Sequence, residues 1–195
     1  MRYNKRIFFR LLSSVIALIV AMSFISCGEN KSNDASMTES LIESYMKAFR
    51  DFNISDINKC CLADRDIYDD SKDVVKACRA ISNRTEWEIL DISIDGSSAI
   101  AQLRLTIPSD TDTICGSALN DAVKALDSGS DDSYADLLIS AIRKRAASAK
   151  TEEISVEINM TKVENKWYIV KSLGVNRKLS DIRTSVTAVF SMLEG

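Results

Sequence analysis

The sequence feature that most constrains the fold is EWEILDISIDGSSAIAQLRLTI, in which apolar and polar residues alternate on both sides of one Asp-Gly pair. Asp-Gly between two alternating runs is a strong signal for a β-hairpin. We expect strands over about 86–94 and 99–107, joined at Asp95-Gly96, with Pro108 ending the second strand. One face of this pair should be buried and the other wetter. The residues predicted to share buried faces are Leu90, Ile92 and Ile94 in the first strand, and Ala99, Ala101, Leu103, Leu105 and Ile107 in the second.

A second alternating stretch predicts another β-hairpin, with a strand over about 154–161, a turn near 164–166 and a return strand in WYIVKSL. The remaining residues after position 36 have helical spacing, with capping signals at Ser36, Ser55, Ser71 and Leu179-Ser180 and two further helices between 111 and 150. Two of the apolar stripes expected to face the core are Ile57, Cys60, Cys61 and Leu62 in the second helix, and Leu119, Val123 and Leu126 in the first inserted helix.

Residues 1–26 have the pattern of an export signal, in which four basic residues precede an apolar run too short for an ordinary membrane span. The run ends in Ser26-Cys27 and not in small residues of the A-x-A kind, and this ending resembles the lipobox of bacterial lipoproteins. The resemblance implies a diacylglyceryl group on Cys27, cleavage before it, and a lipid-anchored location on the cell membrane, facing outside the cytoplasm. Residues 27–36 are then the lipidated cysteine and a polar tether, and residues 37–195 form a single domain. The alternatives are an uncleaved signal anchor, or plain secretion with Cys27 free.

Composition limits the partners and the chemistry of the mature chain. The signal contains four of the 25 basic residues and none of the 28 acidic ones, so the rest of the chain carries a net charge of −7. That balance argues against nucleic acid as a partner and against general attraction to an anionic membrane surface. The sequence has no histidine, which removes the commonest general base and the commonest metal ligand. We therefore expect no catalytic residue, no cofactor and no metal site.

Four cysteines follow Cys27, and they contain no C-x-x-C pair that would indicate zinc. Outside the cytoplasm disulfides are permitted, and Cys61 could pair with Cys78 if their helices pack together. The alternative, which we favour, is that Cys60, Cys61, Cys78 and Cys115 are small buried apolar groups.

The N-terminal helices, the strand pair WEILDISIDGSSAIAQLRL and the late strand VENKWYIVKSL together resemble bacterial lipoproteins with a nuclear-transport-factor-2-like, or cystatin-like, domain. The resemblance covers about residues 37–175. It implies an α+β fold in which N-terminal helices pack on a curved four-stranded antiparallel sheet. Residues 111–150 depart from the compact form of that family and are interpreted as a helical insertion between the two hairpins, and a C-terminal helix follows. This fold family hosts enzymes and binding modules alike, so it does not assign a function.

Few side chains stand out as members of a site. Trp87, Ile89 and Tyr168 could line a pocket near a sheet edge, although residues of these types more often fill a core. Acidic clusters occur within 64–73 and 127–132, but neither has the spacing of a calcium-binding loop. Solvated helix caps and loops are the favoured interpretation of both clusters.

These observations predict a membrane-anchored, non-enzymatic domain that binds an envelope protein or a small ligand. One alternative is a small-pocket enzyme that uses carboxylates such as Asp91 or Asp95 with a tyrosine, and another is a structural envelope protein. A deep pocket with two buried ionisable groups would favour the enzyme. A sheet face filled by side chains would favour interaction through the surface.

Overall fold

The computed structural model describes residues 33–63 and 70–192, so the predicted export signal and Cys27 lie outside the described residues. The chain divides into two compact units, 1–37 and 38–195, and the described part of the first unit, 33–37, is helical. Residues 33–36, which we expected to belong to the tether, are therefore part of the N-terminal helix described over 33–50. The capping pattern at Ser36 did not mark a helix start, because the helix has already begun at that position.

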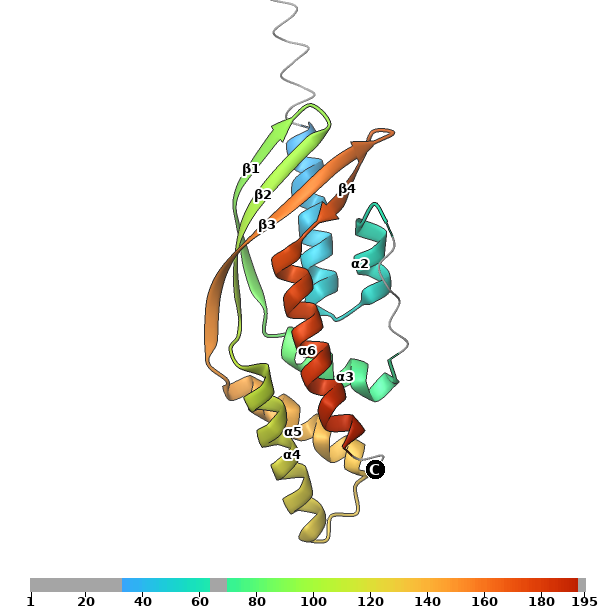
Figure 1. Ribbon diagram of the computed structural model, residues 1–195, viewed down its shortest axis with the longest axis vertical. Helices are drawn as coiled ribbons and strands as arrows, with labels where there is room; N and C mark the ends of the chain where they lie inside the picture. The colour runs from blue at the N-terminus through green and yellow to red at the C-terminus, as the bar shows by residue number, and fades with distance from the viewer. Residues whose placement is uncertain (1–32, 64–69, 193–195) are drawn as a thin grey trace, which may run out of the picture. The chain divides into compact units, whose positions relative to one another are not determined.

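Residues 38–195 form an α+β unit with one four-stranded antiparallel sheet in the order β1-β2-β3-β4 (Figure 1). The predicted fold class, the two hairpins, the helical insertion and the C-terminal helix are confirmed. After the N-terminal helix, the elements are α2 (Ile54–Cys60), α3 (Lys72–Ser82), β1 (Glu86–Asp95), β2 (Ser98–Pro108), α4 (Thr111–Asp127), α5 (Tyr134–Ser148), β3 (Thr151–Val163), β4 (Lys166–Lys171) and α6 (Leu173–Ser191).

Both hairpins close through two-residue loops. In such loops, positive φ values give a backbone twist that matches the right-handed twist of the flanking strands. Gly96 has φ +58° at the first position of the β1–β2 loop, a conformation that glycine adopts without a steric penalty. Glu164 and Asn165 have φ values of +49° and +65° in the β3–β4 loop. The predicted turns are confirmed to within one residue, since the first loop is Gly96-Ser97 and not Asp95-Gly96, and the second turn uses two non-glycine residues.

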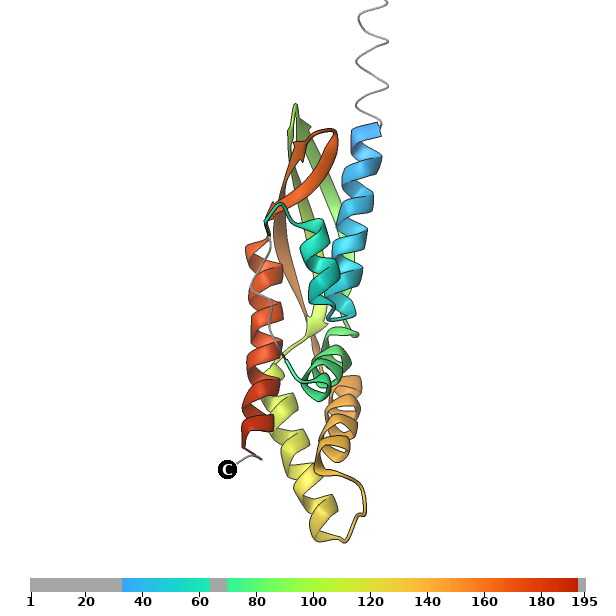
Figure 2. The ribbon, with the colours of Figure 1, turned by 90° about the vertical axis from the view of Figure 1, so that its right-hand side faces the viewer.

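Residues 38–50 of the N-terminal helix and α6 lie on the same face of the sheet, which we call the inner face (Figures 1 and 2). The predicted inward set on β2, from Ala99 to Ile107, is buried there. Tyr45 of the N-terminal helix is also buried, and its hydroxyl donates a 3.0 Å hydrogen bond to Oδ1 of Asn176 in α6. The two helices, which are far apart in the sequence, therefore cover one sheet together. The other buried apolar side chains of the N-terminal helix are Ile42, Met46, Ala48 and Phe49.

The inward set on β1 differs from the prediction because the strand contains a β-bulge. Ile89 pairs with Leu103 and Asp91 pairs with Gln102, which leaves Leu90 as an extra residue in the ladder. The extra residue reverses the alternation, so Leu90 is 46% exposed and does not share a face with Ile92 and Ile94 as predicted. The residues of β1 that pair with inward positions of β2 are Trp87, Ile89, Ile92 and Ile94.

Two other predicted stripes were wrong at particular residues. Helix α2 is capped by Asn53, two residues before the predicted start, and it ends at Cys60. Leu62, predicted to face the core, is 48% exposed, because after Cys60 the chain is extended and its amide donates to the carbonyl of Ile169 at the edge of β4. In α4 the buried face consists of Ile114, Cys115, Ala118 and Ala122, and the predicted stripe Leu119, Val123 and Leu126 is half-buried or exposed.

Helix α6 begins at Leu173, and its N-cap Ser172 lies eight residues before Ser180, the N-cap that the signal Leu179-Ser180 predicted. No cap signal marks this start, since the N-cap residue Ser172 makes no side-chain capping hydrogen bond. The first turn is held instead by packing, because Val175 is buried and Gly174 lies directly against Val156 of β3. Tertiary contact thus forms a helix turn that local sequence signals do not indicate.

We predict that Gly174→Ala destabilises the fold, because a methyl group on Gly174 would lie 2.6 Å from Cγ1 of Val156. Overpacking of this kind costs about 1–3 kcal/mol, to be measured as the free energy of unfolding of the full chain in urea. Adding Val156→Ala to the variant should remove the clash and recover part of that loss.

Gly116→Ala is the matched control, because it also lies inside a helix and a methyl group there meets no atom within 4 Å. This substitution should be neutral or should stabilise by up to about 1 kcal/mol. Equal destabilisation by the two alanine variants would show that the close approach of Gly174 to Val156 does not matter.

Candidate functional site

The inner face of the sheet is filled by side chains at the position where a ligand pocket was considered. Trp87 and Ile89 pair with Leu105 and Leu103, so the sequence-predicted pair does lie on this face. The indole Nε1 of Trp87 donates a 3.0 Å hydrogen bond to Oε1 of Glu43 in the N-terminal helix. The guanidinium of Arg50 lies over the same ring, 5.2 Å from its centroid, which is within the range of a cation–π contact. Trp87 therefore fastens the helix to β1.

Tyr168, the third residue considered for the pocket, does not lie with the other two. It pairs with Thr161, whereas its neighbours Trp167 and Ile169 are buried on the inner face. The Tyr168 ring is half-buried on the opposite side, with the ammonium of Lys166 at 4.9 Å from its centroid. Alternation along β4 separates this ring from Trp87 and Ile89, so the three side chains cannot line one pocket.

One of the carboxylate and tyrosine combinations considered for catalysis, Asp95 with Tyr168, is not assembled. Asp95 and Tyr168 belong to one cross-strand row, in which Ser98 and Thr161 stand between them. Three strand spacings separate the two residues, which is about 14 Å. That separation is far beyond hydrogen-bond reach, so this pair cannot share a proton.

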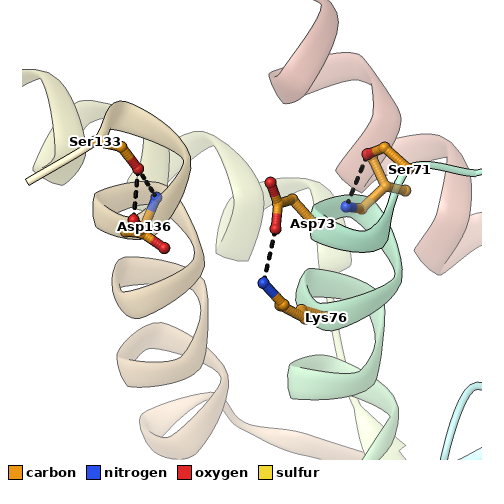
Figure 3. A network of polar contacts seen from close by, with 6 residues as sticks. Ser71, Asp73, Lys76, Ser133 and Asp136 are labelled. Carbon is orange, nitrogen blue, oxygen red and sulfur yellow. Dashed lines mark hydrogen bonds and ion pairs between the residues drawn. The ribbon is translucent and has the colours of Figure 1, made fainter.

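Asp70 and Asp73, the described members of the first acidic cluster, make ion pairs, and Figure 3 shows Asp73 near the start of α5. The Asp73 carboxylate in the first turn of α3 lies 2.9 Å from the ammonium of Lys76, and this hydrogen bond raises the pKa of Lys76, with a smaller contribution from Asp136. Asp136 accepts a 2.5 Å hydrogen bond from the hydroxyl of Ser133, which caps α5. The contacts of Asp73 and Asp136 in the first turns of α3 and α5 are typical of solvent-exposed helix ends. Solvated helix ends were the interpretation favoured from the sequence. Asp64, Asp66 and Asp69 lie outside the described residues.

Asp70 makes the most buried ion pair among the described residues. Its side chain is only 7% exposed, and Arg183 of α6 contacts both carboxylate oxygens at 2.7–3.0 Å. A bidentate guanidinium is the arrangement that best compensates a buried carboxylate. The pair joins α6 to the residue just before the cap of α3, and its role is therefore structural.

The four described cysteines are free thiols. Cys60, Cys78 and Cys115 are buried, and Cys61 is half-buried, so the Cys61–Cys78 disulfide is not formed in this structure. Burial raises the pKa of the Cys115 thiol to about 12 and raises the pKa of Cys78 further, with a smaller contribution from Asp70. Buried thiols with raised pKa values are poor nucleophiles, because the thiolate is the reactive species.

Two surface hollows, with volumes of about 290 and 300 Å³, flank the start of α4, and Asp110 lines both. The Asp110 carboxylate caps α4 by accepting hydrogen bonds from the backbone and the hydroxyl of Thr113, which lower its pKa. In the first hollow, Arg145 is held by both oxygens of Asp121 at 2.7 and 2.8 Å. Asp110 and Arg145 are thus engaged, the first in capping α4 and the second in joining α5 to α4.

The face of the sheet opposite the helices, which we call the outer face, carries an excess of carboxylates on β1, β2 and β3, whereas β4 contributes the cation Lys166 beside Tyr168. The outward positions of β1, β2 and β3 hold a single guanidinium, that of Arg104, which lies 2.9 Å from Glu88 and 3.9 Å from Glu153. The acidic side chains at these outward positions, all of them exposed, are Glu86, Glu88, Asp91, Asp95, Glu153 and Glu157. Glu86 and Glu88 are two residues apart, and the pairs Asp91–Asp95 and Glu153–Glu157 are four apart, so even spacing along the predicted strands could have identified parts of this face.

Exposed apolar side chains lie among these charges. Ile100 of β2 is 42% exposed and pairs with Ser93 and Asn159 at outward positions. A second bulge, in β4, leaves Val170 as an extra residue that is 56% exposed, as the first bulge does for Leu90. No hairpin pattern in the sequence indicates either bulge, so the sequence alone did not identify these three residues as an exposed set.

Comparisons with known proteins add little to this geometry. The sequence matches no known protein family and no curated protein. Among solved structures, the chain is similar to a "putative lipoprotein (ycdA) from Bacillus subtilis subsp. subtilis str. 168", with a TM-score of 0.40 and 15% sequence identity. The similarity covers 74% of this chain and 46% of the Bacillus chain, so the chain spans less than half the length of that protein. A TM-score of this size is too low to support an argument.

One further property bears on how the chain could associate with a membrane. Within residues 33–63 and 70–192, none of the helices is both long enough and apolar enough to cross a bilayer.

We predict that a thiol reagent labels Cys61 first in the folded full chain, because Cys60, Cys78 and Cys115 are buried. Raising the pH from about 7 to about 9 should leave Cys78 and Cys115 unlabelled, since their pKa values are raised and few thiolates form. Peptide mapping by mass spectrometry measures each site, and unfolding in urea should expose all four thiols. Rapid labelling of Cys78 in the folded chain would contradict the buried placement.

We predict that Arg183→Met lowers the free energy of unfolding by about 2–4 kcal/mol, because it leaves the buried Asp70 carboxylate without this guanidinium. Adding Asp70→Asn should recover part of the loss, since the amide carries no charge. Arg104→Met is the control, because its ion pairs are exposed and should be worth at most about 1 kcal/mol. Equal losses in the two single variants, measured by urea unfolding, would mean that the burial of Asp70 has no energetic consequence.

Proposed function

We propose that this protein is a lipid-anchored extracytoplasmic lipoprotein whose domain is a non-enzymatic binding or protein-interaction module at the cell envelope. The observation that carries the proposal is Ser26-Cys27 at the end of a short apolar run that follows four basic residues. An acylated Cys27 with two chains on its diacylglyceryl group would anchor the chain stably, whereas one chain would hold it only marginally.

The filled inner face supports interaction through the surface and not catalysis in a pocket. Tyr45 and Phe49 of the N-terminal helix, and Leu103 and Leu105 of β2, are all buried. The carboxylates nearest to helix ends hold caps and ion pairs, and the sequence has no histidine to act as a general base. A module of this kind would recognise its partner with exposed side chains.

The anchor would hold the domain close to the bilayer. The helix is described from residue 33, so six residue steps separate it from Cys27. Even a fully extended chain spans only about 20 Å over that distance. The partner would therefore be a component of the envelope that comes within reach of the membrane surface.

We predict that Cys27→Ala abolishes incorporation of a fatty-acid label into the full chain and stops cleavage before residue 27. The physical reason is that the thiol of Cys27 is the only atom that could receive the diacylglyceryl group at this site. Labelling of cells with an alkyne fatty acid, followed by membrane fractionation, measures both outcomes. Cys61→Ala is the control and should keep its label, and unchanged labelling of Cys27→Ala would refute the assignment.

A further inference from the structure

We propose that the outer face of strands β1 to β3 is a docking surface for a basic polypeptide segment that also carries apolar side chains. The proposal rests on the proposed function only in placing that partner at the cell envelope. The surface is defined by Asp91, Gln102 and Glu157 in one cross-strand row, by the neighbouring Ile100, and by the other outward carboxylates of the three strands.

Charge complementarity indicates that the partner carries a positive charge. Six exposed carboxylates and one guanidinium occupy the outward positions of β1, β2 and β3, and Arg104 is shared between Glu88 and Glu153. Such a face attracts lysine- or arginine-rich segments and speeds their association at low salt. The same charge repels an anionic membrane surface, and it would repel the outer face of a second copy of this chain.

The exposed apolar residues indicate that the partner contributes more than charge. Ile100 lies next to the row of Asp91, Gln102 and Glu157, and the bulges expose Leu90 and Val170 on the two edge strands. Large aliphatic side chains on an otherwise acidic sheet face favour a ligand in which basic and apolar residues occur together.

Docking on the face is favoured over pairing at an edge. The bulge at Leu90 interrupts the ladder positions of β1, and bulges discourage the addition of another strand. The edge of β4 is partly occupied, because the amide of Leu62 donates to the carbonyl of Ile169 at 3.0 Å. A partner would therefore contact side chains across the strands and would not extend the sheet.

The test uses the full chain in a neutral detergent and a short synthetic peptide in which lysine and valine alternate. Its binding, measured by fluorescence anisotropy against a detergent blank, should weaken at least about tenfold in the double variant Asp91→Lys/Glu157→Lys. Binding should also weaken between about 0.05 and 0.3 M salt, as expected for exposed charges. Ile100→Ser should weaken binding without changing the net charge.

The matched control is Asp127→Lys/Asp131→Lys, which changes the net charge by the same amount at exposed positions at the end of α4 and in the α4–α5 connection. This control should bind the peptide as the unaltered chain does, and thermal unfolding should show that both double variants are folded. Equal weakening by the two double variants would overturn the proposal, because the attraction would then come from net charge alone.

Three other results would also overturn it. A peptide of alternating glutamate and valine could bind equally well, anionic phospholipid vesicles could bind through the same residues, or Asp91→Lys/Glu157→Lys could dissociate a dimer of the chain. These results are independent of fatty-acid labelling at Cys27. Failure of peptide binding with intact labelling would remove only the docking surface, and loss of the anchor would leave peptide binding unchanged.

Discussion

The apolar inner face of the sheet is the constraint on which the rest of the domain depends. A sheet with alternating apolar positions must cover one face, and burial of that area is the main favourable term in folding. Two helices from opposite ends of the chain supply the cover, joined by the hydrogen bond between Tyr45 and Asn176. The close approach of Gly174 to Val156 brings α6 onto β3, so the absence of a side chain at one position sets how closely the layers pack.

The same constraint separates the roles of the two faces. Because helices fill the inner face, the aromatic side chain of Trp87 holds a helix in place and does not line a pocket. The polar contacts around α3, α4 and α5 are caps and ion pairs, and they fix the helical insertion at the end of the sheet. In the part of the chain that the structure describes, no helix covers the outer face, and this is the face proposed for recognition.

The fold concentrates part of the negative charge of the chain on one face of the sheet. An excess of acidic residues in the sequence is only a net property, whereas the sheet collects six of them on one face of three strands. The short segment between the proposed lipid anchor and the domain would then bring this face near envelope components. Repulsion from anionic lipid would keep the face available to a basic partner. The lipid anchor and the acidic face are thus complementary parts of one proposed role.

By itself, the sequence determined the α+β class, the positions of both hairpins and the existence of the inserted helices. These features are local, since alternation of period two, Asp-Gly turns and helical spacing act over a few residues. The predicted export signal and the proposed lipid attachment at Cys27 likewise rest on local patterns in the sequence.

Only the tertiary structure decided which side chains share a face. Each bulge shifts the alternation by one residue, so Leu90 and Val170 are exposed although the strands containing them were predicted. The start of α6 and the small-residue face of α4 depend on packing between distant segments, and local propensity cannot specify such contacts. The outer face could therefore be assembled only once register, bulges and covering helices were known.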